Sequence, residues 1–125
     1  MKRIILEMGM GNDLYGEDYT KAACRAVEDA IHHSSLIIFR SLGFDQADMQ
    51  VKVTIGVQQP DRVVTSIVAQ KLPRGKAEVV AVKGGLNVVD AENNTCSVVA
   101  TAAVEAYLNI NPTDWVISKP SVASD

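Results

Sequence analysis

The sequence predicts an α/β (α+β) domain with the element order β-α-β-α-β-β. Strict alternation of apolar and polar residues over 50–57 is typical of a half-buried strand, and apolar residues recur at helical spacing after Glu17. The composition agrees, because 47% of the residues are hydrophobic but only 5% are aromatic, and Val, Ile and Ala suit a sheet with closely packed helices. We expect one domain over residues 1–111, followed by a C-terminal extension over 112–125.

The first two elements are a buried strand over residues 2–8 and a long helix. The helix is expected to begin near Glu17 or Asp18, because acidic residues are favoured in a first turn. Gly43 is a natural stop for it, and the polar residues 32–35 predict a kink or a short break. Its apolar face is formed by residues three or four positions apart: Ala23, Val27, Ala30, Ile31, Leu36, Phe39 and Leu42.

The middle of the chain predicts strand, helix and strand in turn. In the strand over 50–57, the Val and Ile residues face one way, while Lys52, Thr54 and Gly56 face the other. Pro60 suits the first turn of a second helix, which is ended by residues 73–75. The apolar face of that helix is Val63, Val64, Ile67, Val68 and Leu72. A third strand over 78–83 is closed by a pair of glycines.

Residues 97–110 fit two patterns. Polar residues four apart would make one stripe on a helix, and the alanines favour helix by propensity. The same residues also alternate between apolar and more polar side chains, as in a strand. We predict a strand, because the sheet would otherwise have only three strands.

The expected sheet is mixed, four-stranded and covered by two helices on one face. Its other face also needs a cover, and self-association is the simplest cover for so small a chain. The element order resembles the chorismate-mutase-like and YjgF-like trimers, which have clefts between subunits. The resemblance implies a homotrimer or a multiple of one.

Charge and cysteine usage exclude several classes of protein. The formal net charge is −3 and no basic stripe with interleaved aromatics is present, so nucleic acid is not an expected partner. No apolar run approaches about 18 residues, so no membrane span is predicted. Glu7 comes too early for a signal peptide, and the isolated Cys24 and Cys96 are expected to be reduced thiols in a cytoplasmic protein.

The glycine-rich segment 9–16 is the strongest candidate for a site. It follows the first strand and precedes the first helix, where glycine allows a tight turn or a close approach of a ligand. Its pattern differs from G-x-G-x-x-G and no P-loop Lys follows, so neither a dinucleotide nor another cofactor is expected. Asp13 is an acid/base group, a metal ligand or a helix-proximal cap.

Other candidates lie at strand ends and on the first helix. Glu7 and Lys83 would approach each other if the first and third strands are near neighbours. Arg25 lies one turn after Lys21 and could bind an anion, or face solvent. Neither His32 nor His33 has the spacing of a zinc ligand, so no metal is expected.

The segment 9–16 resembles a G-x-G-x-D-x-H-G motif of a small family of uncharacterised proteins from bacteria and plants. The resemblance extends over most of residues 4–90, including 20–23, 29–31, 34–36 and 82–86. The family histidine is Tyr15 here. A more distant similarity to one repeat of the ring-opening amidohydrolases rests on residues 11–13 and 83–85, but Lys83 replaces the serine nucleophile, so that chemistry does not carry over.

Two functions follow as hypotheses. The first is an oligomeric enzyme that acts on a small polar or anionic metabolite at intersubunit clefts, by the side-chain acid/base chemistry of Glu7, Asp13 and Lys83. The second is a non-catalytic, metabolite-binding oligomer. The expected ligand-binding residues are Gly9, Gly11, Tyr15, Gly16, Arg25, His33, Ser34, Gly84 and Gly85.

Overall fold

The computed structural model describes residues 2–32, 49–72 and 76–108. The elements are β1 (Lys2–Asp13), α1 (Tyr19–His32), β2 (Gln50–Val57), the 3-10 turn η2 (Pro60–Arg62), α3 (Thr65–Ala69), β3 (Lys76–Lys83), β4 (Leu86–Asp90) and β5 (Thr95–Leu108). Several predictions fall outside the described residues. They concern the ligand-binding residues His33 and Ser34, the end of the first helix up to Gly43, and the extension 112–125.

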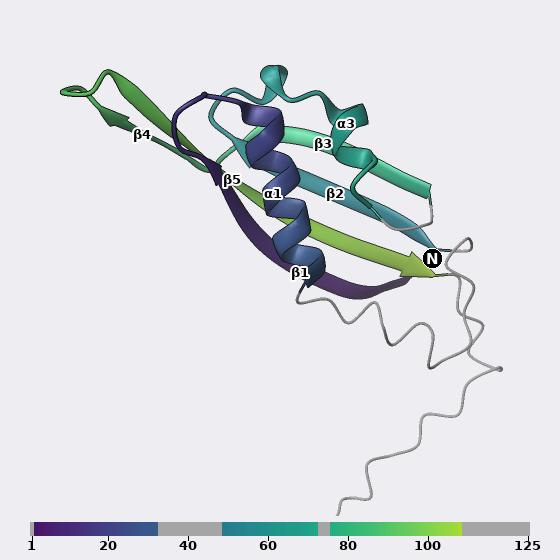
Figure 1. Ribbon diagram of the computed structural model, residues 1–125. Helices are drawn as coiled ribbons and strands as arrows, with labels where there is room; N and C mark the ends of the chain where they lie inside the picture. Colours follow the sequence, from purple (N-terminus) through teal and green to yellow (C-terminus); the bar gives the residue numbers. More distant parts are fainter. Residues whose placement is uncertain (1, 33–48, 73–75, 109–125) are drawn as a thin grey trace, which may run out of the picture.

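The sheet has five strands and is mixed. Its order is β1-β5-β2-β3, and β4 pairs with β5 beyond the end of β2. β2 and β3 are parallel, whereas β5 is antiparallel to each of its three neighbours. Figure 1 shows α1 and α3 together on one face of the sheet, with the β4–β5 hairpin projecting past its end.

The core lies between this helical layer and the sheet. Alternate residues of β2 and β5 face the helices and are buried, as the alternation over 50–57 predicts. On α1, the buried residues are mostly alanine, so the helix sits close to β1 and β5. The strand predicted over 97–110 is confirmed, since β5 covers Thr95–Leu108.

Three predictions are corrected. The first strand does not end at residue 8 but continues to Asp13, so Gly9 and Gly11 lie inside a strand and not in the turn before the helix. The helix predicted after Pro60 is divided into η2 and the five-residue α3. The sheet has five strands and not four, because the short β4 forms a hairpin with β5.

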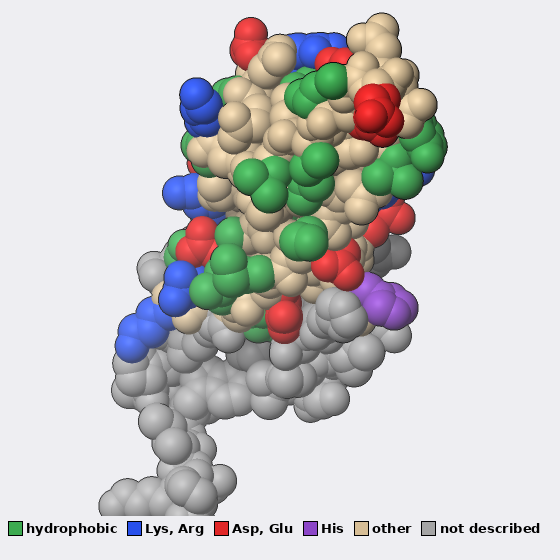
Figure 2. Space-filling model, turned by 90° about the vertical axis from the view of Figure 1, so that its left-hand side faces the viewer, with side chains coloured by type: hydrophobic (Ala, Val, Ile, Leu, Met, Phe, Trp, Pro, Cys, Tyr) green, Lys and Arg blue, Asp and Glu red, His purple; other side chains and the backbone are tan. Residues whose placement is uncertain are grey.

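The second sheet face is not covered by any described helix. Leu6, Met8 and Met10 of β1 lie on this face and are 44%, 70% and 61% exposed. Figure 2 shows hydrophobic side chains in several groups on one side of the molecule, with charged side chains mostly around them. Among the described residues, no helix is long and apolar enough to cross a membrane.

Candidate functional site

The glycines of β1 lie beneath α1. A Cβ added to Gly9 would lie 2.5 Å from the carbonyl oxygen of Ala26, and one added to Gly11 would lie 2.6 Å from the Cβ of Arg25. Real Cβ atoms do not approach other atoms this closely, so only glycine lets the helix reach the strand here. Gly9 and Gly11 are therefore helix-packing positions, and this packing accounts for their spacing without a ligand.

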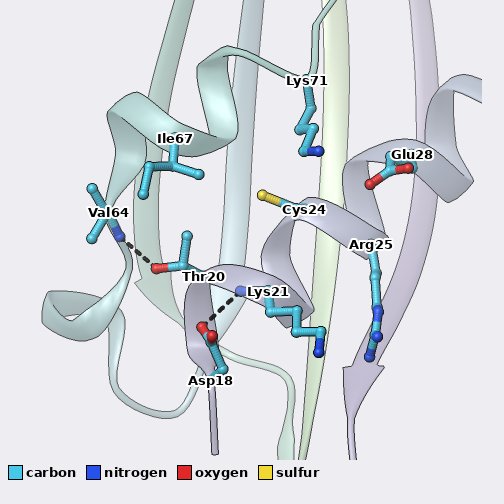
Figure 3. Close-up of a pocket in the computed structure, with 9 residues that line it drawn as sticks. All are labelled: Asp18, Thr20, Lys21, Cys24, Arg25, Glu28, Val64, Ile67 and Lys71. Carbon is cyan, nitrogen blue, oxygen red and sulfur yellow. Dashed lines mark hydrogen bonds between the residues drawn. The ribbon is translucent and has the colours of Figure 1, made fainter.

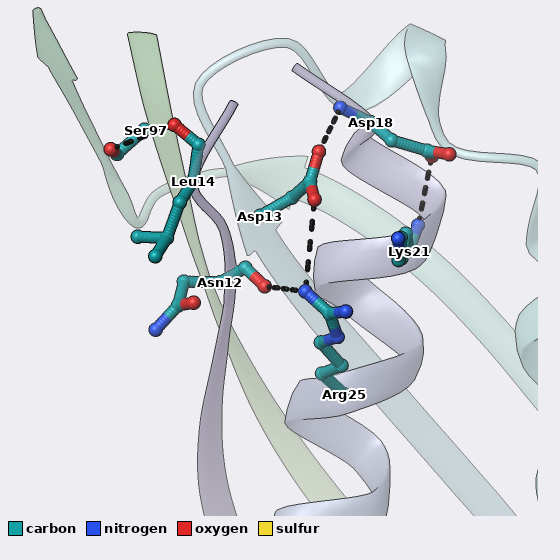
Figure 4. A network of polar contacts seen from close by, with 7 residues as sticks. All are labelled: Asn12, Asp13, Leu14, Asp18, Lys21, Arg25 and Ser97. Carbon is teal, nitrogen blue, oxygen red and sulfur yellow. Dashed lines mark hydrogen bonds and ion pairs between the residues drawn. The ribbon is translucent and has the colours of Figure 1, made fainter. Parts of the chain in front are cut away.

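Asp13 ends β1 and holds the loop that leads into α1. Its side chain is buried, and one carboxylate oxygen accepts a 3.0 Å hydrogen bond from the backbone N–H of Asp18. The other oxygen lies 3.7 Å from Arg25 of α1. The same Arg25 nitrogen donates a 2.7 Å hydrogen bond to the carbonyl of Asn12, so helix and strand are joined at two points (Figure 4).

The residues around Asp13 complete the start of the helix. Asp18 accepts a 2.9 Å hydrogen bond from the backbone N–H of Lys21, which is the interaction of an N-cap residue. Gly16 faces Asp13, because a Cβ on Gly16 would lie 2.9 Å from the Asp13 carboxylate. Tyr15, at the tip of this loop, is 79% exposed. These contacts give Asp13 a positioning role in the loop; an acid/base role stays a prediction.

Glu7 and Lys83 do not meet within one chain. Glu7 lies on β1, Lys83 ends β3, and both β5 and β2 lie between these strands. The expected approach assumed that the first and third strands are neighbours, but the long β5 inserts between β1 and β2. Any chemistry that needs both side chains together would therefore need residues from two copies.

Gly84 and Gly85 form the connection from β3 to β4. The backbone of Gly85 has a positive φ of 62°, and a Cβ there would be 2.8 Å from the carbonyl oxygen of Gly56. The side-chain amide of Gln58 donates to the carbonyls of both glycines, at 3.1 and 3.3 Å. This turn carries the chain across the end of β2, so its glycines too have a structural reason.

A groove of about 580 Å³ lies between α1 and α3. It brings together one residue that the sequence selected, Arg25, and several that it did not select. The lining residues are Asp18, Thr20, Lys21, Cys24, Arg25, Glu28, Val64, Ile67 and Lys71 (Figure 3). Three of these side chains are basic and two are acidic, and the Asp18 carboxylate is already used as the cap of α1.

Thr20 fixes the two walls of the groove to each other. Its hydroxyl accepts a 2.9 Å hydrogen bond from the backbone N–H of Val64, just before α3. Next to it, the guanidinium of Arg62 lies 4.8 Å from the ring centroid of the buried Tyr19, and the Tyr19 hydroxyl accepts a 2.7 Å hydrogen bond from Asn87. The groove is thus bounded by elements that are fixed before any ligand arrives.

Cys24 lies in the groove and is only 6% exposed. Burial raises the pKa of its thiol, and the nearby ammonium group of Lys71 partly offsets that rise in the pKa. The thiol is therefore protonated at neutral pH, and it presents a weakly polar surface beside the basic side chains. In the described part of the chain, no group of three potential ligand residues is placed to hold a metal ion.

Comparison with protein families gives a match over residues 3–106 to a family described as conserved hypothetical protein (Lin0512_fam). The chain belongs to this family. The expectation of an uncharacterised conserved family is thereby confirmed. Comparison with curated protein sequences gave no significant match.

A solved structure has a similar fold and a related sequence. The chain is similar to the crystal structure of an FtsZ-like protein of unknown function from Nostoc punctiforme, with a TM-score of 0.76 and 32% identity. The match covers 87% of this chain and 97% of that one. The fold is therefore shared by nearly the whole of that relative.

The groove was only partly accessible to sequence reasoning. Lys21 and Arg25 are four residues apart, and this spacing indicates a shared helix surface. Lys71 lies 46 residues beyond Arg25 in the sequence, and no local pattern pairs it with α1. Only the position of α3 on the helical face of the sheet brings Lys71 close to Cys24.

Proposed function

We propose that the chain is a small-molecule-binding protein that takes an anionic metabolite in the groove between α1 and α3. The observation that carries this function is that three basic side chains, Lys21, Arg25 and Lys71, line one groove. Within the described residues, neither Lys21 nor Lys71 forms an ion pair, so their ammonium groups can still bind a carboxylate or a phosphate.

Binding is favoured over catalysis by the positions of the predicted catalytic residues. Asp13 accepts a hydrogen bond from the Asp18 backbone and lies beside Arg25. Glu7 and Lys83 are on β1 and β3, the two edge strands of the order β1-β5-β2-β3. An acid/base pair needs two groups within reach of one substrate. The groove instead offers an excess of basic over acidic side chains, a hydroxyl that is already hydrogen-bonded, and a thiol with a raised pKa.

A thermal-shift screen with carboxylic acids and sugar phosphates tests this function. A ligand present at about 100 times its dissociation constant stabilises the folded state by about 2.7 kcal/mol, which is a readily measured shift in Tm. Replacement of a groove lysine, Lys21→Met or Lys71→Met, is expected to weaken the binding of any hit. Lys2→Met is the matched control, since Lys2 is an exposed lysine at the start of β1 and outside the groove.

Two results would contradict the proposal. One is that no anion in the panel shifts Tm. The other is that a hit binds with equal affinity to the Lys71→Met variant and to the Lys2→Met control.

The second candidate is acid/base catalysis at a cleft between copies. It is favoured by the placement of Glu7 and Lys83 on opposite edge strands, because edge contact between two copies brings β1 of one copy towards β3 of the next. Turnover of a metabolite that is lost in Glu7→Gln, with its binding retained, would support this candidate. Binding without turnover supports the first.

A further inference from the structure

The sheet face opposite the helices is a continuous surface built from all five strands. Seven of the exposed large hydrophobic side chains in the described residues lie on it: Leu6, Met8, Met10, Val80, Val82, Leu86 and Val88. Scattered single hydrophobic side chains are normal on a protein surface, whereas a contiguous group marks an interaction site. We call this surface the open face.

The strand register arranges the open face in rows. The first row is Met10, Thr101, Gly56 and Val82, in the order β1, β5, β2, β3. The second row is Met8, Ala103, Thr54 and Val80. The third row is Leu6, Glu105, Lys52 and Glu78. The first two rows carry no charge, and the third has an acidic, a basic and an acidic residue on neighbouring strands.

The two uncharged rows are too small to be a whole interface. Strands lie about 4.8 Å apart and rise about 3.3 Å per residue, so two rows over four strands cover a footprint of roughly 250 Å². A specific protein interface buries about 800 Å² on each partner. A stable partner must therefore also cover the third row and the β4–β5 hairpin, and it must match the charges of Glu105 and Lys52.

A second copy of this chain can match these charges. We propose that two copies pack their open faces together around a two-fold axis that runs along the strands, between β5 and β2. This rotation keeps each row level and reverses its order, so each β5 residue lies over the β2 residue of the same row in the other copy. Glu105 then faces Lys52 of the second copy, and Lys52 faces its Glu105.

The same operation matches the uncharged rows. Met8 lies over Val80 of the second copy, and Ala103 lies over Thr54. At the edge of the third row, Leu6 lies over Glu78, whose carboxylate can remain in solvent. Sheets that pack face to face keep their strand directions within about 30° of each other, so the rows stay matched near the axis.

In the alternative arrangement, the strands of the two copies run antiparallel, and the charged residues then do not face opposite charges. A two-fold axis across the strands places each strand over itself and inverts the order of the rows. With the second row at the centre, Glu105 would face Thr101, and Lys52 would face Gly56. Two charged groups would then be buried against uncharged partners, which is costly. A three-fold assembly, which we expected from the element order, does not place this face on itself.

Glu105 is held ready for such a contact. Its carboxylate accepts a 2.8 Å hydrogen bond from the Tyr107 hydroxyl and a 3.2 Å bond from Arg3, and its side chain is 18% exposed. The carboxylate is therefore fixed on the open face and not free to turn away. An opposite charge from a second copy adds to this arrangement, whereas a like charge opposes it.

Light scattering on the full chain and two charge-reversed variants tests the proposal. The unmodified chain is expected at twice the chain mass of 13.4 kDa. Lys52→Glu and Glu105→Lys should each shift towards the chain mass, with a dissociation constant at least about tenfold higher, because like charges then face each other. An equal mixture of the two variants should return to twice the chain mass, because the acidic copy complements the basic one.

The mixture separates contacts between copies from contacts within a chain. In each variant the cross-strand neighbours 52 and 105 carry like charges within one chain, and mixing cannot change that. Asp61→Lys, at an exposed position of η2 on the helical side of the sheet, is the matched charge-reversal control and should leave the mass unchanged. If a charge reversal prevents folding by circular dichroism, Thr54→Glu in the second row should dissociate the pair instead.

Three outcomes would overturn the proposal. They are a single-chain mass for the unmodified protein, a mass of three chains, and a mixture of the two variants that remains dissociated. None of these results bears on anion binding in the groove, which lies on the other side of the sheet.

Discussion

The backbone of Ala26 in α1 occupies the space next to Gly11 where a side chain would otherwise lie. The same helix turns past Gly9, and its buried face is formed largely by alanines. Small residues on both surfaces let the helix axis approach the strand closely. The distance between α1 and β1 is therefore set by the absence of side chains on β1 at two positions.

Gly11→Ala is expected to destabilise the fold. The added methyl group meets helix backbone, which cannot move without displacing the whole of α1, and overpacking of a well-packed core costs about 1–3 kcal/mol. Gly84→Ala is the matched control, because its Cβ would come no closer than 3.2 Å to a neighbouring atom. Chemical denaturation of both variants measures the difference, and equal stabilities would contradict the packing role of Gly11.

The sequence predicted which strands are present better than it predicted where they begin and end. Alternation in β2 and β5 predicted both strands, because one face of each is buried and the pattern has a period of two. The predicted first strand ended too early because Gly9 was interpreted as the start of a turn. A glycine in a strand can mark either a turn or the close approach of another element, and the sequence does not show which element arrives. The sequence predicted the helix, but only the fold shows that it lies over Gly9 and Gly11.

Asp13 illustrates the same limit for the site. An acidic residue before a helix predicted either a cap or a functional carboxylate, and the hydrogen bond to Asp18 shows a positioning role. Lys71 and Cys24 are on separate elements, so their meeting depends on tertiary packing that no local pattern contains. The expected pairing of Glu7 with Lys83 was wrong within one chain because strand order, not chain order, decides which strand ends meet.

Two variants separate the roles of Asp13. Asp13→Asn keeps an oxygen that can accept from the Asp18 backbone but loses the charge opposite Arg25, so a loss of roughly 0.3–1 kcal/mol is expected. Asp13→Ala leaves the Asp18 N–H without this acceptor and should cost about 1–3 kcal/mol. Thermal unfolding of both variants gives the order. A fully stable Asp13→Ala variant would show that the carboxylate is not needed for the loop, and would favour a purely functional role.

The hydrogen bond from Tyr107 predicts an acid-dependent stability. The Tyr107 hydroxyl, followed by Arg3, holds the pKa of Glu105 below its ordinary value of 4.5. Because the folded-state pKa is lowered, the stabilisation is present above pH 4.5 and is lost as the pH falls through the folded-state pKa. Tyr107→Phe should raise the pKa of Glu105 towards 4.5, as measured by NMR titration of its carboxyl carbon.

Arg3→Met serves as the comparison for that titration. Arg3 lowers the pKa of Glu105 through both a hydrogen bond and its charge, so its removal should also raise that pKa. An unchanged pKa in Tyr107→Phe would show that the 2.8 Å contact is not maintained in solution.

The two cysteines should differ in reactivity towards iodoacetamide. Both are free thiols, but Cys24 is 6% exposed beneath the groove, whereas Cys96 on β5 is only partly buried. Burial also raises the pKa of Cys24, so less of the reactive thiolate is present at mildly alkaline pH. Mass spectrometry of the folded protein should therefore show Cys96 labelled first, and both cysteines should react at similar rates in denaturant.

Lys71→Met should slow Cys24 further, because the lysine charge lowers the thiol pKa. Equal labelling rates in the folded state would show that the thiol is open to solvent, and a rate unaffected by Lys71→Met would place the ammonium group away from Cys24.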